Sequence, residues 1–254
     1  MWTCGMLKAN ARQALQGRYW RSFWVTLVLS LLGGGASGIN LNYNLNNLSS
    51  SPEQTAEQFY DMPALAAPLV LALLSAAFIV LVLGALWNVF LSSPLRVGGC
   101  RYFMESRQAP SPFGTLFSVF RTPYLNVVKV QFLTGLKISV GYLLLLIPGI
   151  YWTYCYAMVP YLLAENPYLT TTRAMELSKQ MMYGEKVRLF VLELSFIGWY
   201  LLCMLTLGIG LFFLTPYTQA TFAEFYAAMR AKALAQGLAT TDELGGFVTH
   251  DTNP

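Results

Sequence analysis

Residues with the chemistry for catalysis are few in this sequence of 254 residues. The one histidine, His250, lies close to the end of the chain, and the three aspartates are Asp61, Asp242 and Asp251. None of these four residues falls in the long apolar stretches. A histidine base, a histidine metal site and a pair of intramembrane aspartates are therefore excluded there.

One serine motif and four cysteines remain to be considered. Gly35-Ala36-Ser37-Gly38 matches the G-x-S-G of rhomboid proteases, but that chemistry needs a histidine on a neighbouring span. We interpret the motif as a glycine-rich helix end. The cysteines are scattered without the spacing of metal ligands, at positions 4, 100, 155 and 203. We therefore expect no enzymatic activity, no catalytic residue, no cofactor and no metal.

Three charged residues inside apolar stretches are the candidate polar sites: Lys129, Lys137 and Glu193. A charge at the bilayer centre costs about 2.5–3.5 kcal/mol on insertion scales and usually marks a function or a partner. At ~1.5 Å per residue, Lys129 and Glu193 enter their helices to depths that agree within about 2 Å. They are candidates for a salt bridge. The alternative is that each side chain reaches the membrane surface separately.

Lys137 lies deeper, ~20 Å along a helix of ~35 Å, and no acidic residue is expected at its depth. It either faces a hydrated cavity or donates to backbone carbonyls freed by Pro160 or Pro216. We hypothesise a polar cavity between three predicted membrane spans, the third (near 124–147), the fourth (near 149–164) and the sixth (near 210–229). Replacement of Lys137 by leucine should then alter ligand binding or transport.

The arrangement of charge and hydropathy indicates a membrane protein. Only 11% of the residues are charged and mean hydropathy is +0.48, whereas about 25% are charged in soluble domains. All but two of the 16 lysines and arginines form four short clusters between apolar runs. By the positive-inside rule these clusters lie on the cytoplasmic side. Because they flank apolar runs, we expect them to meet a lipid bilayer and not nucleic acid.

The predicted fold is all-α: a polytopic transmembrane helical bundle of about six spans in three hairpins, with interfacial amphipathic helices. Chain reversals are expected at Pro148-Gly149 and Gly208-Ile209-Gly210. The predicted parts are an N-terminal cytoplasmic interfacial helix (1–21), a transmembrane domain (22–229) and a disordered cytoplasmic tail (230–254). The spans are expected near 22–39, 68–91, 124–147, 149–164, 187–207 and 210–229, with interfacial helices at 6–20, 110–120 and 170–184.

An ordered set of short motifs resembles a known family. The set comprises Leu146-Ile147-Pro148-Gly149-Ile150, Tyr156-Ala157-Met158, Pro160-Tyr161, Asn166-Pro167, Ser178-Lys179, Gly184-Glu185-Lys186, Leu194 to Trp199, Gly208-Ile209-Gly210, Pro216-Tyr217, Ala220-Thr221 and Phe225-Tyr226. From Leu7 to about Met229 the chain resembles the bacterial integral membrane family called domain of unknown function 975.

The resemblance implies a multi-span bacterial membrane protein without an assigned activity, so it assigns no catalytic residues. Two positions depart from the family pattern. Glu165 stands where aspartate is usual, and Lys137 stands where an apolar residue is expected. Any role of Lys137 would then be special to this chain.

Two functions follow as alternatives. The amphipathic cytoplasmic segments favour a non-enzymatic accessory or scaffold protein that holds a membrane-protein partner. The proline-broken spans and Lys137 favour a transporter or binding protein for a lipid or small amphiphile. In both, the chain is a multi-pass protein of the inner (plasma) membrane with cytoplasmic termini. The sequence does not determine the substrate, the partner or the oligomeric state.

Overall fold

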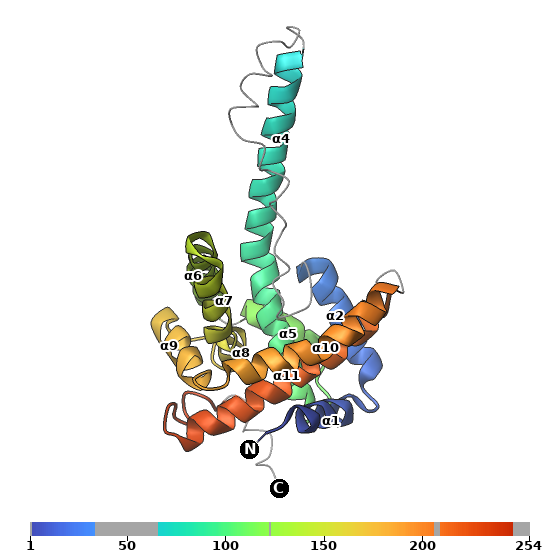
Figure 1. Ribbon diagram of the computed structural model, residues 1–254, viewed down its shortest axis with the longest axis vertical. Helices are drawn as coiled ribbons and strands as arrows, with labels where there is room; N and C mark the ends of the chain where they lie inside the picture. Colours follow the sequence, from blue (N-terminus) through green and yellow to red (C-terminus); the bar gives the residue numbers. More distant parts are fainter. Residues whose placement is uncertain (1, 34–65, 122, 206–208, 246–254) are drawn as a thin grey trace. The chain divides into compact units, whose positions relative to one another are not determined.

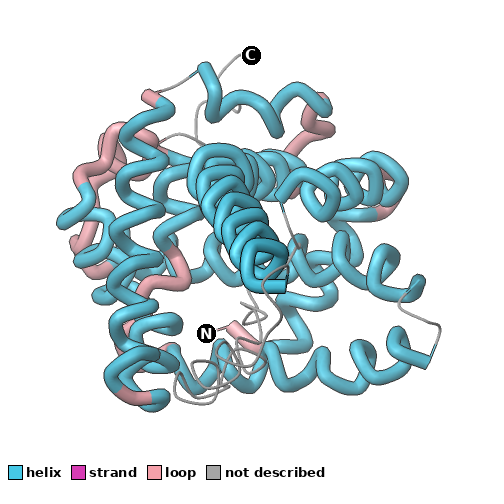
Figure 2. The backbone as a smooth tube through the Cα atoms, turned by 90° about the horizontal axis from the view of Figure 1, so that it is seen from above, coloured by secondary structure: helices cyan, strands magenta, loops and turns pink. Residues whose placement is uncertain are grey.

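A computed structural model describes residues 2–33, 66–121, 123–205 and 209–245 (Figure 1). Regular structure within these ranges is helical, and no strand occurs there (Figure 2). The all-α prediction is therefore confirmed. The chain divides into two compact units, residues 1–37 with 89–254 and residues 38–88.

The first unit begins with helices α1 (Cys4–Leu15) and α2 (Tyr19–Gly33). The Thr3 hydroxyl caps α1 by accepting a hydrogen bond of 3.3 Å from the backbone N–H of Met6. Leu7, Ala11 and Leu15 recur every four residues and are buried together. The predicted amphipathic character of segment 6–20 is confirmed as far as Leu15. The predicted helix is too long, because residues 16–18 form a turn and α2 begins at Tyr19.

Helix α4 (Ala66–Trp87) belongs to the second unit. It is apolar on all sides, and the side chains from Leu71 to Asn88 are exposed. A π-helical turn, η2 (Asn88–Ser92), and helix α5 (Ser93–Ser106) follow along the chain. Pro94 lies in the first turn of α5, where its missing N–H leaves no hydrogen bond unmade.

The predicted interfacial segment 110–120 contains a 3-10 helix, η3 (Phe113–Arg121). Leu116 and Val119 are buried, whereas the rings of Phe113, Phe117 and Phe120 are exposed. Successive phenylalanine rings lie 6.2 and 6.4 Å apart between centroids. The helix thus turns an aromatic row outward, as residues at a membrane surface do.

Helices α6 (Tyr124–Leu144) and α7 (Leu146–Cys155) pack side by side (Figure 1). The expected reversal at Pro148-Gly149 is wrong in position, because the extended backbone of Leu145 separates the two helices. Gly149 lies inside α7 against Tyr142. A Cβ atom at Gly149 would meet that ring at 2.5 Å, so the glycine permits close helix packing.

Helix α8 (Val159–Glu165) follows α7 after a turn at residues 156–158. The fourth predicted span is therefore broken at residues 156–158 and not at Pro160. Pro160 lies in the first turn of α8, a position that proline suits. Every residue of α8 is buried, so the second half of the predicted fourth span is enclosed by protein.

The remaining helices are α9 (Thr171–Met181), α10 (Lys186–Leu205) and α11 (Ile209–Ala235). Thr170 caps α9, and Ala174, Leu177 and Met181 are buried, as expected for the amphipathic segment 170–184. Helices α10 and α11 pack against each other. Residues 206–208, including the first residue of the predicted Gly208-Ile209-Gly210 reversal, lie outside the described residues.

Three helical segments of the described chain are long and apolar enough to cross a bilayer: Val70–Ser106, Tyr124–Leu144 and Lys186–Leu205. They correspond to the second, third and fifth predicted spans. The first predicted span extends into residues 34–39, outside the described residues. The fourth is divided between α7 and α8, and α7 alone rises only about 15 Å, half of the hydrocarbon core. The sixth lies within α11, where Thr215, Gln219 and Glu224 interrupt the apolar run.

The expected disorder of the tail is wrong for residues 230–245. Helix α11 continues to Ala235, and the following turn buries Ala239 and Leu244. The side chains that hold this turn are distant in the sequence, which is why local composition did not reveal it. Residues 246–254 lie outside the described residues.

Candidate functional site

The predicted partners Lys129 and Glu193 do not meet. Glu193 on α10 instead accepts a hydrogen bond of 2.5 Å from the Tyr154 hydroxyl on α7. Lys129 is exposed, and the ion pairs of the described residues do not include it. Equal depth along two helices does not determine which helix faces meet, and Glu193 faces α7.

The Lys137 ammonium lies over the Tyr156 ring, 5.2 Å from its centroid. The expected hydrogen bonds to carbonyls near Pro160 or Pro216 do not form between described residues. An aromatic face attracts the cation in their place. Lys137 also lines neither of the two cavities described below. Its prediction as a ligand residue stays a prediction.

A buried charged cluster, formed by Glu165, Tyr226 and Arg230, was missed by sequence reasoning. The Glu165 side chain is 0% exposed. Its carboxylate accepts a hydrogen bond of 2.5 Å from the Tyr226 hydroxyl and one of 2.8 Å from Arg230 Nε. Tyr161 stacks on Tyr226 with ring centroids 5.2 Å apart. The cluster joins α8 to α11 with every carboxylate oxygen hydrogen-bonded, as a buried charge requires.

A second ion pair joins α5 to the same part of α11. Arg107 donates to both carboxylate oxygens of Glu224, from Nε at 2.6 Å and from Nη2 at 3.1 Å. The Glu224 side chain is 8% exposed. Such a two-pronged pair fixes orientation as well as distance.

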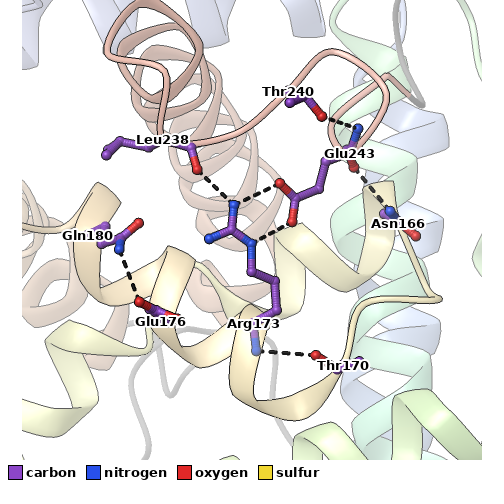
Figure 3. Close-up of polar contacts among 8 residues, drawn as sticks. All are labelled: Asn166, Thr170, Arg173, Glu176, Gln180, Leu238, Thr240 and Glu243. Atoms are coloured by element: carbon purple, nitrogen blue, oxygen red, sulfur yellow. Dashed lines mark hydrogen bonds and ion pairs between the residues drawn. The ribbon is translucent and has the colours of Figure 1, made fainter.

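A third pair holds the C-terminal turn (residues 236–245) on α9 (Figure 3). Arg173 donates to the two carboxylate oxygens of Glu243 at 2.7 and 2.9 Å and to the Leu238 carbonyl at 2.8 Å. Asn166 donates to the Glu243 carbonyl at 3.1 Å. The hydrogen bonds from Arg173 lower the pKa of Glu243, and Glu243 raises the pKa of Arg173.

Sequence alone held a weak signal for these pairs. Glu165, Glu224 and Glu243 lie near the basic clusters of the cytoplasmic segments, but their partners are 65, 117 and 70 residues away in the chain. The arginines were interpreted as anchors for lipid headgroups. Three of these arginines, Arg107, Arg173 and Arg230, instead form ion pairs with glutamates of this chain.

Described residues of the first unit line at least two cavities. One, of about 640 Å³, lies between α2, α5 and the start of η3, and the other, of about 400 Å³, lies between α9 and the end of α11. The second contains Lys179 and Lys232 beside Glu176, and Lys232 is already paired with Glu185 at 3.0 Å. Within the described ranges, no three His, Cys, Asp or Glu side chains gather as a metal site would require.

Comparison with known proteins supports the resemblance seen in the sequence. Residues 112–233, slightly less than half of the chain, match the family described as Protein of unknown function (DUF975). The resemblance is confirmed over these residues, which run from the start of η3 to near the end of α11. The earlier residues, from Leu7 onward, lie outside the match. No curated protein and no solved structure matched the chain.

Proposed function

We propose that the protein is an integral membrane protein of the inner (plasma) membrane that acts without catalysis, as an accessory or scaffold for a membrane-protein partner. Both termini lie in the cytoplasm in this proposal, and six segments enter the bilayer. The observation that carries it is the outward display of apolar side chains on helices of membrane length. Helices α6 and α10 rise about 31 and 30 Å, matching a core of about 30 Å.

The distribution of exposed side chains supports insertion. From Leu143 to Ile147, at the junction of α6 and α7, each side chain is 65–87% exposed. Leu205, at the end of α10, is 82% exposed. In water, apolar surface of this extent would be costly, whereas lipid chains cover it without penalty.

The ion-paired helices of the first unit support the scaffold role. Ion pairs tie α5, α8, α9 and α11 into a body with the amphipathic helix α1 packed on α11. The amphipathic segments are thus parts of one folded body, which offers a fixed surface to a partner.

Labelling of single cysteines tests the topology. With Cys4 replaced by serine, Gln108→Cys and Gln236→Cys should react from the cytoplasmic side only, because both positions are exposed near the ion-paired body. Leu145→Cys should react from the outer side only. Labelling of Leu145→Cys from the cytoplasm would contradict the proposed spans.

Purification in mild detergent, with mass spectrometry of proteins and lipids, tests the role. A partner at constant stoichiometry, lost when a surface residue of α1 such as Arg12 is changed, supports the scaffold. Absence of any stoichiometric protein partner overturns it, and a transported or bound metabolite or lipid would then favour the binding or transport alternative.

A further inference from the structure

The cavity of about 640 Å³ is lined by one cation together with apolar and hydroxyl-bearing side chains, whereas ion pairs join the helices α5, α8, α9 and α11. Helix α2 contributes a cation and apolar side chains, and the other walls contribute hydroxyl groups and a phenylalanine. No carboxylate lines it. The lining residues are Arg21, Trp24, Val28, Tyr102, Ser111, Pro112 and Phe113.

Close backbone packing fixes the walls of this cavity. Gly98 and Gly99 on α5 lie under η3 and α2 respectively. A Cβ atom at Gly98 would lie 2.0 Å from the Leu116 carbonyl oxygen, and one at Gly99 would lie 2.6 Å from Leu29 Cδ1. The glycines therefore let α2 and η3 approach α5 closely, and the cavity lies beside these contacts.

Arg21 is the charged group of the cavity. Five other arginines, at positions 101, 107, 173, 188 and 230, are paired with carboxylates. Arg21 is exposed, and it has neither a hydrogen bond nor an ion pair with any described residue. A guanidinium in this state matches an anion with two oxygens, such as phosphate.

The rest of the lining selects an amphiphile. Trp24 and Phe113 remain 56% and 44% exposed and offer apolar surface next to Arg21, while the Ser111 and Tyr102 side chains are buried in the wall. The Phe113 ring is also the first of the exposed aromatic row of η3. Tryptophan rings of this kind lie at the level of lipid headgroups.

We propose that this cavity binds one anionic phospholipid of the cytoplasmic leaflet. Arg21 donates to the headgroup phosphate, and Trp24, Val28 and Phe113 contact the start of the acyl chains. The proposal rests on the membrane location proposed above, and it adds a specific lipid site that neither the scaffold role nor the predicted polar residues require.

Native mass spectrometry of the full, delipidated chain in detergent tests it. The chain is titrated with phosphatidylglycerol and with phosphatidylcholine of the same acyl chains. We expect one phosphatidylglycerol to bind before all others, and Arg21→Gln to weaken this binding about tenfold. Arg121→Gln is the matched control, because Arg121 is also an exposed cation, has no ion pair with a described residue and does not line the cavity. It should change the affinity less than twofold.

Three results would overturn the proposal. Equal losses in Arg21→Gln and Arg121→Gln would mean ordinary surface attraction. Equal retention of both lipids would mean no selection of charge, and displacement by millimolar inorganic phosphate alone would make free phosphate the ligand. Because the titration is done in detergent, its failure is separate from failure of the cysteine topology, which tests the membrane proposal itself.

Discussion

The two halves of α11 differ in which side chains are exposed and which are buried. Near the start of the helix, Phe212 and Phe213 are 43% and 47% exposed. Further along, Glu224 and Tyr226 are buried and bonded to groups from α5 and α8. Apolar groups point outward at one end, and charged groups point inward at the other.

The difference is what the membrane location proposed above would produce, with lipid around the first half and protein around the second. An apolar surface is stable in lipid and costly in water, and a buried charge is stable only with a partner. In the proposed membrane location, lipid would cover the exposed apolar side chains of the first half of α11. The second half depends on contacts that the chain supplies itself. Four substitutions test this contrast.

The largest expected effect is at Glu165. Glu165→Ala leaves Arg230 without its buried carboxylate, and loss of one partner of a buried pair costs about 3–5 kcal/mol. Unfolding of the purified protein in detergent measures it. The control Glu176→Ala removes an exposed carboxylate whose hydrogen bond, among the described residues, comes from Gln180, and its cost should stay within about 0.5 kcal/mol. A similar cost for both would mean that the buried charged cluster does not hold α8 to α11.

The next effect is on the membrane side, in α4. Ala77→Arg places a charge on the apolar helix near its middle, and insertion should become less favourable by about 2.5–3.5 kcal/mol. An insertion assay on the segment reads this directly, with Ala77→Leu as control. Equal insertion of the two variants would argue that α4 does not face lipid.

A smaller effect is expected at Tyr154. Tyr154→Phe removes the hydroxyl that donates to Glu193, and hydrogen bonds between membrane helices average about 0.6 kcal/mol. The unfolding midpoint should fall slightly. Tyr168→Phe, at an exposed ring, should not change it. Loss of more than about 2 kcal/mol would mean that this contact is part of the core of the fold.

The smallest effect concerns the C-terminal turn. The Glu243 pKa lies below the ordinary value of 4.5 because Arg173 stabilises the carboxylate. Its contribution is therefore full above pH 4.5 and is lost as pH falls through the lower pKa of the folded state. For a partly exposed pair this is about 0.5 kcal/mol.

Hydrogen exchange of residues 236–245, corrected for intrinsic rates, measures the release of the turn. Glu243→Gln should exchange faster at pH 7 and lose most of its dependence on pH. An unchanged exchange rate in this variant would show that Leu244 burial and the hydrogen bonds to the Leu238 and Glu243 carbonyls hold the turn without the ion pair.

Structural features that depend on residues close together in the chain could be predicted from the sequence. The buried faces of α1 and α9 follow from apolar residues three and four positions apart, and the spans at 68–91, 124–147 and 187–207 follow from length and hydropathy. The reversal near residue 148 was misplaced because proline and glycine occur both in turns and inside helices. Here Pro148 and Gly149 both lie inside α7, and Gly149 serves packing.

The sequence by itself determined that the protein is all-α and that amphipathic helices accompany apolar ones. Of about six spans that it predicted, three correspond to described helices that suit a bilayer. These properties depend on neighbouring residues, whose spacing a helix converts directly into a face. Only the tertiary structure decided which arginines are internal ties, where Glu193 finds its hydrogen bond, and that residues 236–245 are folded. Those contacts join residues 39 to 117 positions apart, and no local pattern records which helix faces will meet.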